Sequence, residues 1–168
     1  MAETMKQYVG RILGYVGNRQ PLRVLRSTPA RVERLLRGVP AAKLRRRPAP
    51  GKWSIAQIVL HLADSELVYG YRLRTILAQN RARIIAFDQN DWAASGRYAR
   101  RDLRTALDML RTLRKANLEL LRVIPRQQWN YFGIHQERGK ESVANMARLY
   151  AGHDLNHLLQ IRRILRAG

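Results

Sequence analysis

The sequence predicts an all-α protein built as a four-helix bundle with a long crossover connection. Four segments carry apolar residues at the helical spacing of three and four positions, and three of these segments are long. No segment shows the alternation that identifies a convincing set of strands. A length of 168 residues is most simply one domain with one core. We therefore expect a single domain over residues 1–168, with residues 1–20 packing on the bundle as an N-terminal extension.

The first helix is predicted over residues 28–38. Thr28 supplies an N-cap hydroxyl, and Pro29 suits the first helical position because the N–H that proline lacks has no helical partner there. A short helical turn around 22–25 is expected before it. Residues 39–52 hold three prolines and an arginine triplet, so we expect a connection there.

The second helix is predicted over residues 54–79. Ser54 and Gln57 have the spacing of a capping box, in which each side chain satisfies a free backbone N–H of the other residue. The following stretch, 80–100, has no helical period and is expected to be irregular. Irregular segments of this length in compact domains are more often lids or crossovers than simple turns.

The third and fourth helices have the longest apolar rows. The third is predicted over 102–124, closed by Pro125, and the fourth over 142–165. The core-facing row of the third helix is expected to be Leu103, Ala106, Leu110, Leu113, Asn117, Leu120 and Ile124. The row of the fourth is expected to be Val143, Met146, Tyr150, His153, His157, Ile161 and Ile164. Steps of three and four residues place each row on one helix face.

The composition is strongly basic, with 32 Lys+Arg against 12 Asp+Glu and a formal net charge of +20. The basic residues are spread through almost every segment, with denser groups at 45–47 and 97–104 and few aromatic residues among them. We interpret the charge as a solvated basic surface that favours anionic partners. A basic module that binds nucleic acid is the alternative, because Lys and Arg neutralise phosphates.

Several classes of protein are excluded or disfavoured. The chain has no cysteine, which excludes disulfides, thiolate metal ligands and a catalytic thiol of its own. No segment approaches the ~18 apolar residues of a membrane span, and the N-terminal residues lack a secretory pattern. We therefore expect a soluble cytoplasmic protein. The HExxH, P-loop and G-x-S-x-G motifs are also absent.

The histidines are the strongest functional signal in the sequence. His153 and His157 are four residues apart on the row that should face the core, so their imidazoles lie one above the other and would chelate a divalent metal. His61, on the apolar face of the second helix, is the natural third ligand. Three nitrogen ligands leave open coordination positions, as in catalytic sites. The alternative is a set of core histidines hydrogen-bonded to neighbouring helices.

Other polar residues are candidates for roles around this site. His135 lies in a glycine-flanked loop, where it either reaches the rim of a pocket or is exposed. Asn117 interrupts an apolar row and either holds a water or substrate or, as is commoner, bonds a neighbouring group. The candidates for catalytic roles are Asn117, Arg114 and His135. The candidates for orienting the imidazoles are Glu66, Asp64 and Asp154, which would otherwise pair with nearby arginines.

Two runs of sequence resemble the signatures of a known family. Residues 48–66 contain W-S-x(6)-H-L-x-D-x-E and residues 151–161 contain H-D-x-N-H-x-x-Q-I. With the intervening segment 114–118, the chain is similar to the DinB-like superfamily over roughly residues 20–165, and closest to its YfiT-type branch of metal-dependent hydrolases. The resemblance implies a four-helix bundle with a long crossover, often dimeric, and a divalent metal held by the residues that match here, His61, His153 and His157.

Members of that superfamily with known activity include low-molecular-weight thiol S-transferases and thiol-dependent isomerases. We therefore expect a metal-dependent enzyme that uses Zn²⁺ or Ni²⁺ to activate water or an external thiol against an electrophilic small molecule. Arg72 is a candidate to hold an anionic substrate. The alternatives are a basic nucleic-acid-binding or stress-response module without catalysis, and a bundle that retains metal without turnover. A homodimer is expected.

Overall fold

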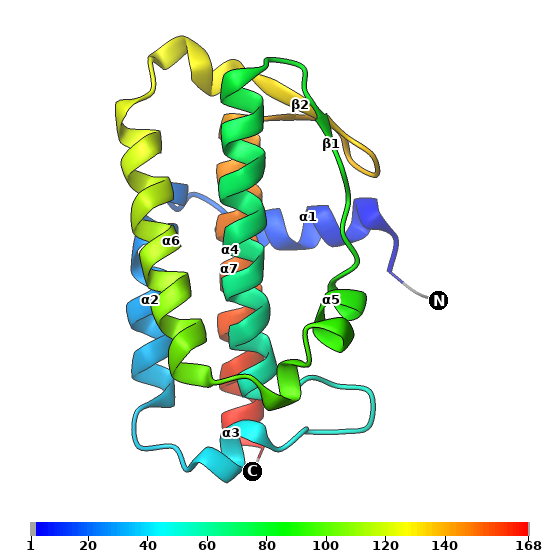
Figure 1. The fold of residues 1–168 in the computed structure, drawn as a ribbon, viewed down its shortest axis with the longest axis vertical. Coiled ribbons are helices and arrows are strands. Elements are labelled where there is room, and N and C mark those ends of the chain that lie inside the picture. Colours follow the sequence, from blue (N-terminus) through cyan, green and yellow to red (C-terminus); the bar gives the residue numbers. More distant parts are fainter. Residues whose placement is uncertain (1–2, 168) are drawn as a thin grey trace.

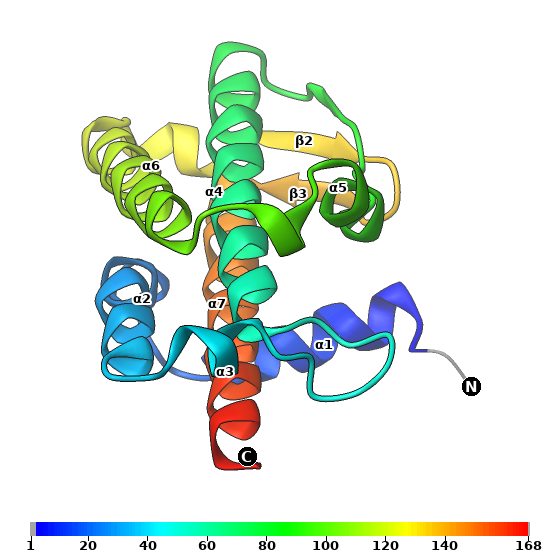
Figure 2. The same ribbon diagram turned by 60° about the horizontal axis from the view of Figure 1, so that its bottom comes forward.

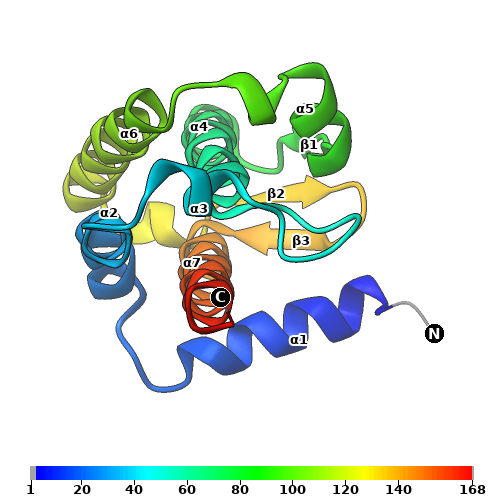
Figure 3. The same cartoon turned by 90° about the horizontal axis from the view of Figure 1, so that it is seen from below.

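Four long helices enclose the core in the computed structural model, which describes residues 3–167 (Figure 1). They are α2 (Pro21–Leu36), α4 (Ile55–Ala78), α6 (Leu103–Val123) and α7 (Val143–Arg166). Seen from below, they stand at the corners of a square, with α2 and α4 each beside α6 and α7 (Figure 3). The prediction of a helical protein with a four-helix bundle is confirmed.

The crossover is the connection between α4 and α6. These two helices are consecutive long elements that run in the same direction, so the chain returns along the length of the bundle between them (Figure 1). The expected irregular stretch is partly regular: it contains β1 (Arg83–Ile84), α5 (Gln89–Ser95) and a 3₁₀ turn at Tyr98–Arg100. Asp88 begins α5 as its N-cap, because its carboxylate accepts the N–H groups of the next turn.

Local signals place α4 correctly and α2 incorrectly. The capping box of Ser54 and Gln57 forms as predicted, and α4 begins at the next residue. However, α2 begins at Pro21, so the predicted start at Thr28 is wrong, and Pro29 lies inside the helix. The Thr28 hydroxyl donates to the carbonyl four residues earlier at 3.0 Å instead of capping. Between α2 and α4 the connection holds one short helix, α3 (Ala41–Arg45).

Proline is tolerated inside α2 because another side chain replaces the hydrogen bond that it removes. Pro29 has no N–H for the carbonyl of Leu25, one helical turn earlier. That carbonyl instead accepts a hydrogen bond from the guanidinium of Arg114 on α6. The interior proline therefore depends on a contact between helices, which a scan of local helix signals does not reveal.

The expectation of a structure without strands is wrong. A three-stranded sheet, in the order β1-β2-β3, joins the crossover to the hairpin of β2 (Phe132–His135) and β3 (Gly139–Ser142) (Figure 2). β1 pairs with β2 in parallel, and β2 pairs with β3 antiparallel. β1 has only two residues, and it pairs because the crossover passes beside the hairpin. Such a strand has no alternation long enough to be recognised in the sequence.

The N-terminal extension contains a further helix, α1 (Met5–Val16), which crosses α7 (Figure 3). Ile12 and Val16 are buried against the bundle. The crossing requires glycine on α7: a Cβ at Gly152 would lie 2.2 Å from the carbonyl oxygen of Ile12. This close approach brings the first turns of α1 next to His153. Within residues 3–167, no helix combines the length and the apolar composition needed to cross a membrane.

Candidate metal centre

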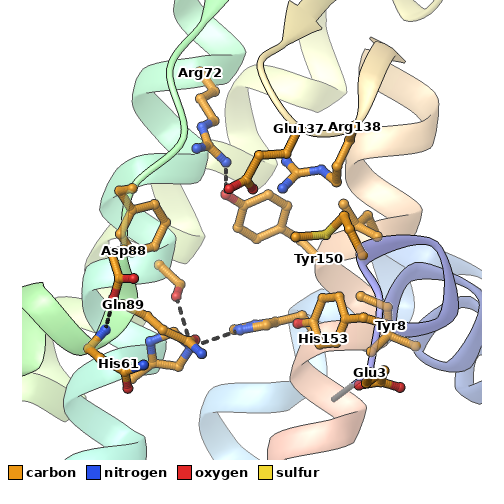
Figure 4. Close-up of a pocket in the computed structure, with 16 residues that line it drawn as sticks. Glu3, Tyr8, His61, Arg72, Asp88, Gln89, Glu137, Arg138, Tyr150 and His153 are labelled. Atoms are coloured by element: carbon orange, nitrogen blue, oxygen red, sulfur yellow. Dashed lines mark hydrogen bonds between the residues drawn. The ribbon is translucent and has the colours of Figure 1, made fainter. Parts of the chain in front are cut away.

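Three histidines from two helices converge in the core of the bundle. His153 Nε2 lies 2.9 Å from His61 Nε2 and 3.1 Å from His157 Nε2. The four-residue spacing of the α7 pair places both rings on one face of α7. Figure 4 shows His153 pointing towards His61 on α4. One nitrogen from each ring falls within a group whose members are all within 4.8 Å of one another.

The arrangement of these nitrogens fits a divalent metal. Nitrogens that each lie about 2.0–2.1 Å from one ion are themselves roughly 3 Å apart, close to the spacing of the histidine Nε2 atoms. His157 Nδ1 is 2.9 Å from Gln160 Oε1, an oxygen that can only accept. The His157 proton therefore sits on Nδ1, which leaves the Nε2 lone pair facing the cluster.

Burial keeps the three imidazoles neutral. Removal from water lowers the pKa of His61 and His153 well below the usual value, and the neighbouring histidines lower both further. Burial also lowers the pKa of His157 to about 4, against the opposing effect of Gln160. At neutral pH the cluster is thus three uncharged rings with converging nitrogens, which is the protonation state that metal ligands require.

A cavity of about 390 Å³ opens onto this cluster. His61 and His153 lie at its inner end, and its walls come from α1, the crossover and the β2–β3 turn (Figure 4). Ser65, one turn after His61 on α4, also lines it and places its Oγ 3.4 Å from His61 Nε2. The ring of Trp53 also packs against His61, at a centroid distance of 4.9 Å.

Residues 25–161 match the sequence profile of the DinB superfamily. The chain belongs to the DinB superfamily. The resemblance carried by the two histidine signatures is thereby confirmed. The relatives of this DinB-superfamily protein include two from Oceanobacillus iheyensis, both named "Putative metal-dependent hydrolase". They are OB0413, 31% identical over 112 residues, and OB0782, 28% identical over 111 residues. These alignments cover 67% and 66% of this chain, and it spans 64% of the length of each relative.

YfiT of Bacillus subtilis, which carries the same printed name, is 26% identical over 147 residues, covering 86% of this chain and 82% of the relative. Its solved structure aligns with a TM-score of 0.81 at 24% identity, over 87% of this chain and 84% of that chain. That structure is described as "a probable metal-dependent hydrolase with an unusual four-helix bundle topology". The structural likeness shows that the two proteins share a fold.

In this DinB-superfamily protein, two of the candidate catalytic residues lie away from the cavity. Arg114 is 2% exposed and binds two carboxylates, Glu66 and Asp154, each at 2.8 Å. Asn117 donates to Glu66 Oε1 at 2.7 Å and accepts from an arginine of α4. Burial raises the pKa of Glu66, and Arg114 opposes that effect. The structure places these four residues in one buried network between helices, separate from the cavity lining.

The other two polar candidates also have partners of their own. His135 is neither in a loop nor exposed: it ends β2 and is 2% exposed, because alternate residues of that strand face inward. Its Nδ1 accepts the N–H of Glu137 at 3.2 Å. Asp64 accepts the Tyr98 hydroxyl at 2.6 Å and a guanidinium N–H of Arg101 at 3.2 Å. Asp64 therefore fastens the end of the crossover to α4.

Sequence reasoning missed Ser65 and Gln160. Ser65 carries a weak signal, because it follows His61 by four residues and so shares its helix face. Gln160 follows His157 by three residues, which is the spacing its hydrogen bond uses.

Replacing Gln160 by leucine is expected to weaken metal binding about 10- to 100-fold, since the His157 ring loses the acceptor that fixes its proton and orientation. Gln160→Glu keeps an acceptor oxygen and is expected to bind metal like the wild type. Titration of metal-stripped protein with Zn²⁺, followed by calorimetry, gives both affinities. Equal weakening in the leucine and glutamate variants would contradict this role.

Proposed function

We propose that this protein is a metal-dependent enzyme in which His61, His153 and His157 hold Zn²⁺ or Ni²⁺. When bound, the ion would lower the pKa of a water or a low-molecular-weight thiol and so supply a nucleophile near neutral pH. The reaction is hydrolysis of a small electrophilic substrate or transfer of the thiol to it. The observation that carries the proposal is the convergence of three neutral imidazole nitrogens at the inner end of a cavity.

The protein supplies the enclosure and the positioning. Phe87, Leu149 and Tyr150 line the cavity with apolar surface, which restricts water around a bound substrate. The Ser65 hydroxyl, beside His61, can hydrogen-bond a group held at the cluster. A thiol nucleophile has to arrive as a co-substrate, because the chain contains no cysteine.

A panel of activated esters, with and without added low-molecular-weight thiols, tests the proposal. Metal-loaded protein is expected to turn over at least one ester or thiol–electrophile pair, and a chelator is expected to abolish that activity. Dependence on added thiol identifies transfer, and activity without thiol identifies hydrolysis. His135→Ala, which alters a buried histidine outside the cluster, serves as the control and should retain activity. Turnover that survives complete metal removal would contradict the proposal.

The alternative of nucleic-acid binding has one observation in its favour. The two basic groups of the sequence meet at one end of the bundle, where Arg47, Arg97 and Arg100 line a common surface hollow. Arg45 also donates to the Ala99 carbonyl at 3.2 Å. Nucleic-acid binding at this hollow would weaken steeply as the salt concentration rises and would not change when a chelator is added. The activity of the proposed enzyme, by contrast, would be lost on addition of a chelator.

A further inference from the structure

Two arginines are buried in the described part of the chain, and only one of them is paired with carboxylates. Arg114 is 2% exposed and is neutralised by two carboxylates at 2.8 Å. Arg72 is 4% exposed, yet none of the described carboxylates lies within 4.0 Å of its guanidinium. A buried charge without a counter-ion is unfavourable. Arg72 therefore carries a buried positive charge that none of the described carboxylates pairs with.

The contacts of Arg72 are all with neutral groups. Its Nη2 donates to the carbonyl of Ile85 at 2.8 Å, and its Nη1 donates to the Tyr150 hydroxyl at a longer 3.4 Å. Its charge lies 5.6 Å from the centre of the Phe87 ring. These contacts hold the guanidinium in place and use two of its five N–H donors. They do not supply a negative charge.

The guanidinium faces the same cavity as the histidine cluster. Arg72 and His61 both line it, and Figure 4 shows them at opposite ends of the space. They lie eleven residues apart on α4, which returns nearly to the same helix face after three turns and about 16 Å of rise. The Arg72 side chain reaches back towards the start of α4, as long side chains on helices do, so its guanidinium points along the cavity towards the histidines (Figure 4).

The remaining charges around the cavity do not neutralise Arg72. Arg138 is bound by Glu141 through hydrogen bonds of 2.9 and 3.0 Å. Three carboxylates also line the cavity: Glu3, Asp88 and Glu137. Glu3 is paired with Arg11, and Asp88 caps α5. Glu137 is exposed and lies at the same end of the cavity as Arg72 (Figure 4), but its carboxylate forms no ion pair with the guanidinium within 4.0 Å. Burial, followed by the fields of Arg138 and Arg72, lowers the pKa of buried His135 to about 4.

We infer that Arg72 binds a carboxylate of the electrophilic substrate and thereby sets the substrate class of the site. The forked donors of a guanidinium match the two oxygens of a carboxylate. The Tyr150 oxygen accepts from Arg72, which leaves its hydrogen free to donate to the same carboxylate. The substrate then carries its carboxylate at one end and its reacting atom at the other end, at the histidines. This inference rests on the proposed function for the identity of the reacting end.

The net charge of the whole chain also favours the binding of an anionic substrate. A formal net charge of +20 raises the local concentration of small anions and speeds their encounter with the cavity. Burial also raises the pKa of Tyr150 to about 12, so its hydroxyl remains protonated and able to donate at neutral pH. The dispersed surface charge thus attracts anions in general, and Arg72 selects the ones that fit.

Phenylacetate and its neutral analogue phenylacetamide provide a matched pair of probes, titrated against the whole chain and followed by NMR chemical shifts. The wild-type protein is expected to bind the acid at least tenfold more tightly than the amide. Arg72→Met, of similar shape, is expected to reduce that preference below twofold. Arg74→Met removes a positive charge from the same helix outside the cavity and is expected to keep the preference. Equal binding of acid and amide by the wild type, or an unchanged preference in Arg72→Met, would overturn the inference.

Two further arms separate this inference from the proposed metal chemistry. The titrations are repeated after metal removal and in His153→Ala, where the preference for the acid should persist because Arg72 is intact. A preference that disappears in both would assign carboxylate binding to the metal and overturn the inference. Arg72→Met is also expected to unfold at a temperature no lower than the wild type, since it removes an unneutralised buried charge. If Arg72→Met fails to fold, Arg72→Lys replaces it, because lysine keeps the positive charge but lacks the forked donors of the guanidinium. Arg72→Lys is expected to reduce the preference for the acid several-fold, and an unchanged preference in this variant would overturn the inference.

Discussion

Replacing Arg114 by methionine is expected to lower the free energy of unfolding by about 3–5 kcal/mol, the usual effect of removing one partner from a buried charge network. Arg114 is 2% exposed and neutralises Glu66 and Asp154. Without it, two carboxylates remain buried among the helices. The Leu25 carbonyl, which the interior proline of α2 leaves free, also loses its donor. Urea unfolding followed by circular dichroism measures the change.

Arg111, on the same helix, is the matched control. Its side chain is 59% exposed and pairs with Asp108 on the surface, so Arg111→Met is expected to change stability by no more than about 1 kcal/mol. A triple variant that combines Arg114→Met with Glu66→Gln and Asp154→Asn is expected to recover much of the loss, since the orphaned charges are gone. Equal losses in the Arg114 and Arg111 variants would contradict the account of this network.

The parts of the fold that sequence predicted are those whose signals are local. The capping box at Ser54 fixes the start of α4, and the predicted row of α7 is buried at Val143, Met146, Tyr150, His157 and Ile161. The errors arose where a distant residue decides the structure. α2 continues through Pro29 because Arg114 satisfies a carbonyl from another helix, and β1 exists only through its pairing with β2. Neither contact has a counterpart in the local sequence.

In the candidate site, too, the features set by local helix spacing could be predicted, and the contacts between helices could not. The spacing of His153 and His157 and the face of α4 that carries His61 were sufficient to predict the cluster, because helix periodicity determines where these side chains point. Spacing could not show that Arg114 and Asn117 are engaged with Glu66, since that contact joins α4 and α6. The expected homodimer and cytoplasmic location stay predictions.

His153→Ala is expected to produce the largest loss of function. His153 Nε2 lies 2.9 and 3.1 Å from the Nε2 atoms of the other two histidines, so in the proposed centre its removal would leave two ligands on different helices. We expect metal affinity to fall by more than the roughly 100-fold that loss of a supporting hydrogen bond can cause. Any metal-dependent turnover should disappear with it. His135→Ala is the control, because His135 is a buried histidine that lies on β2 outside the cluster.

Calorimetric titration of metal-stripped protein with Zn²⁺ distinguishes a metal centre from a set of hydrogen-bonded core histidines. The wild type and His135→Ala are expected to bind one equivalent with the same affinity, whereas His153→Ala is expected to show no comparable binding while remaining folded. Absence of stoichiometric binding in the wild type, or equal binding by all three proteins, would contradict a metal centre formed by His61, His153 and His157.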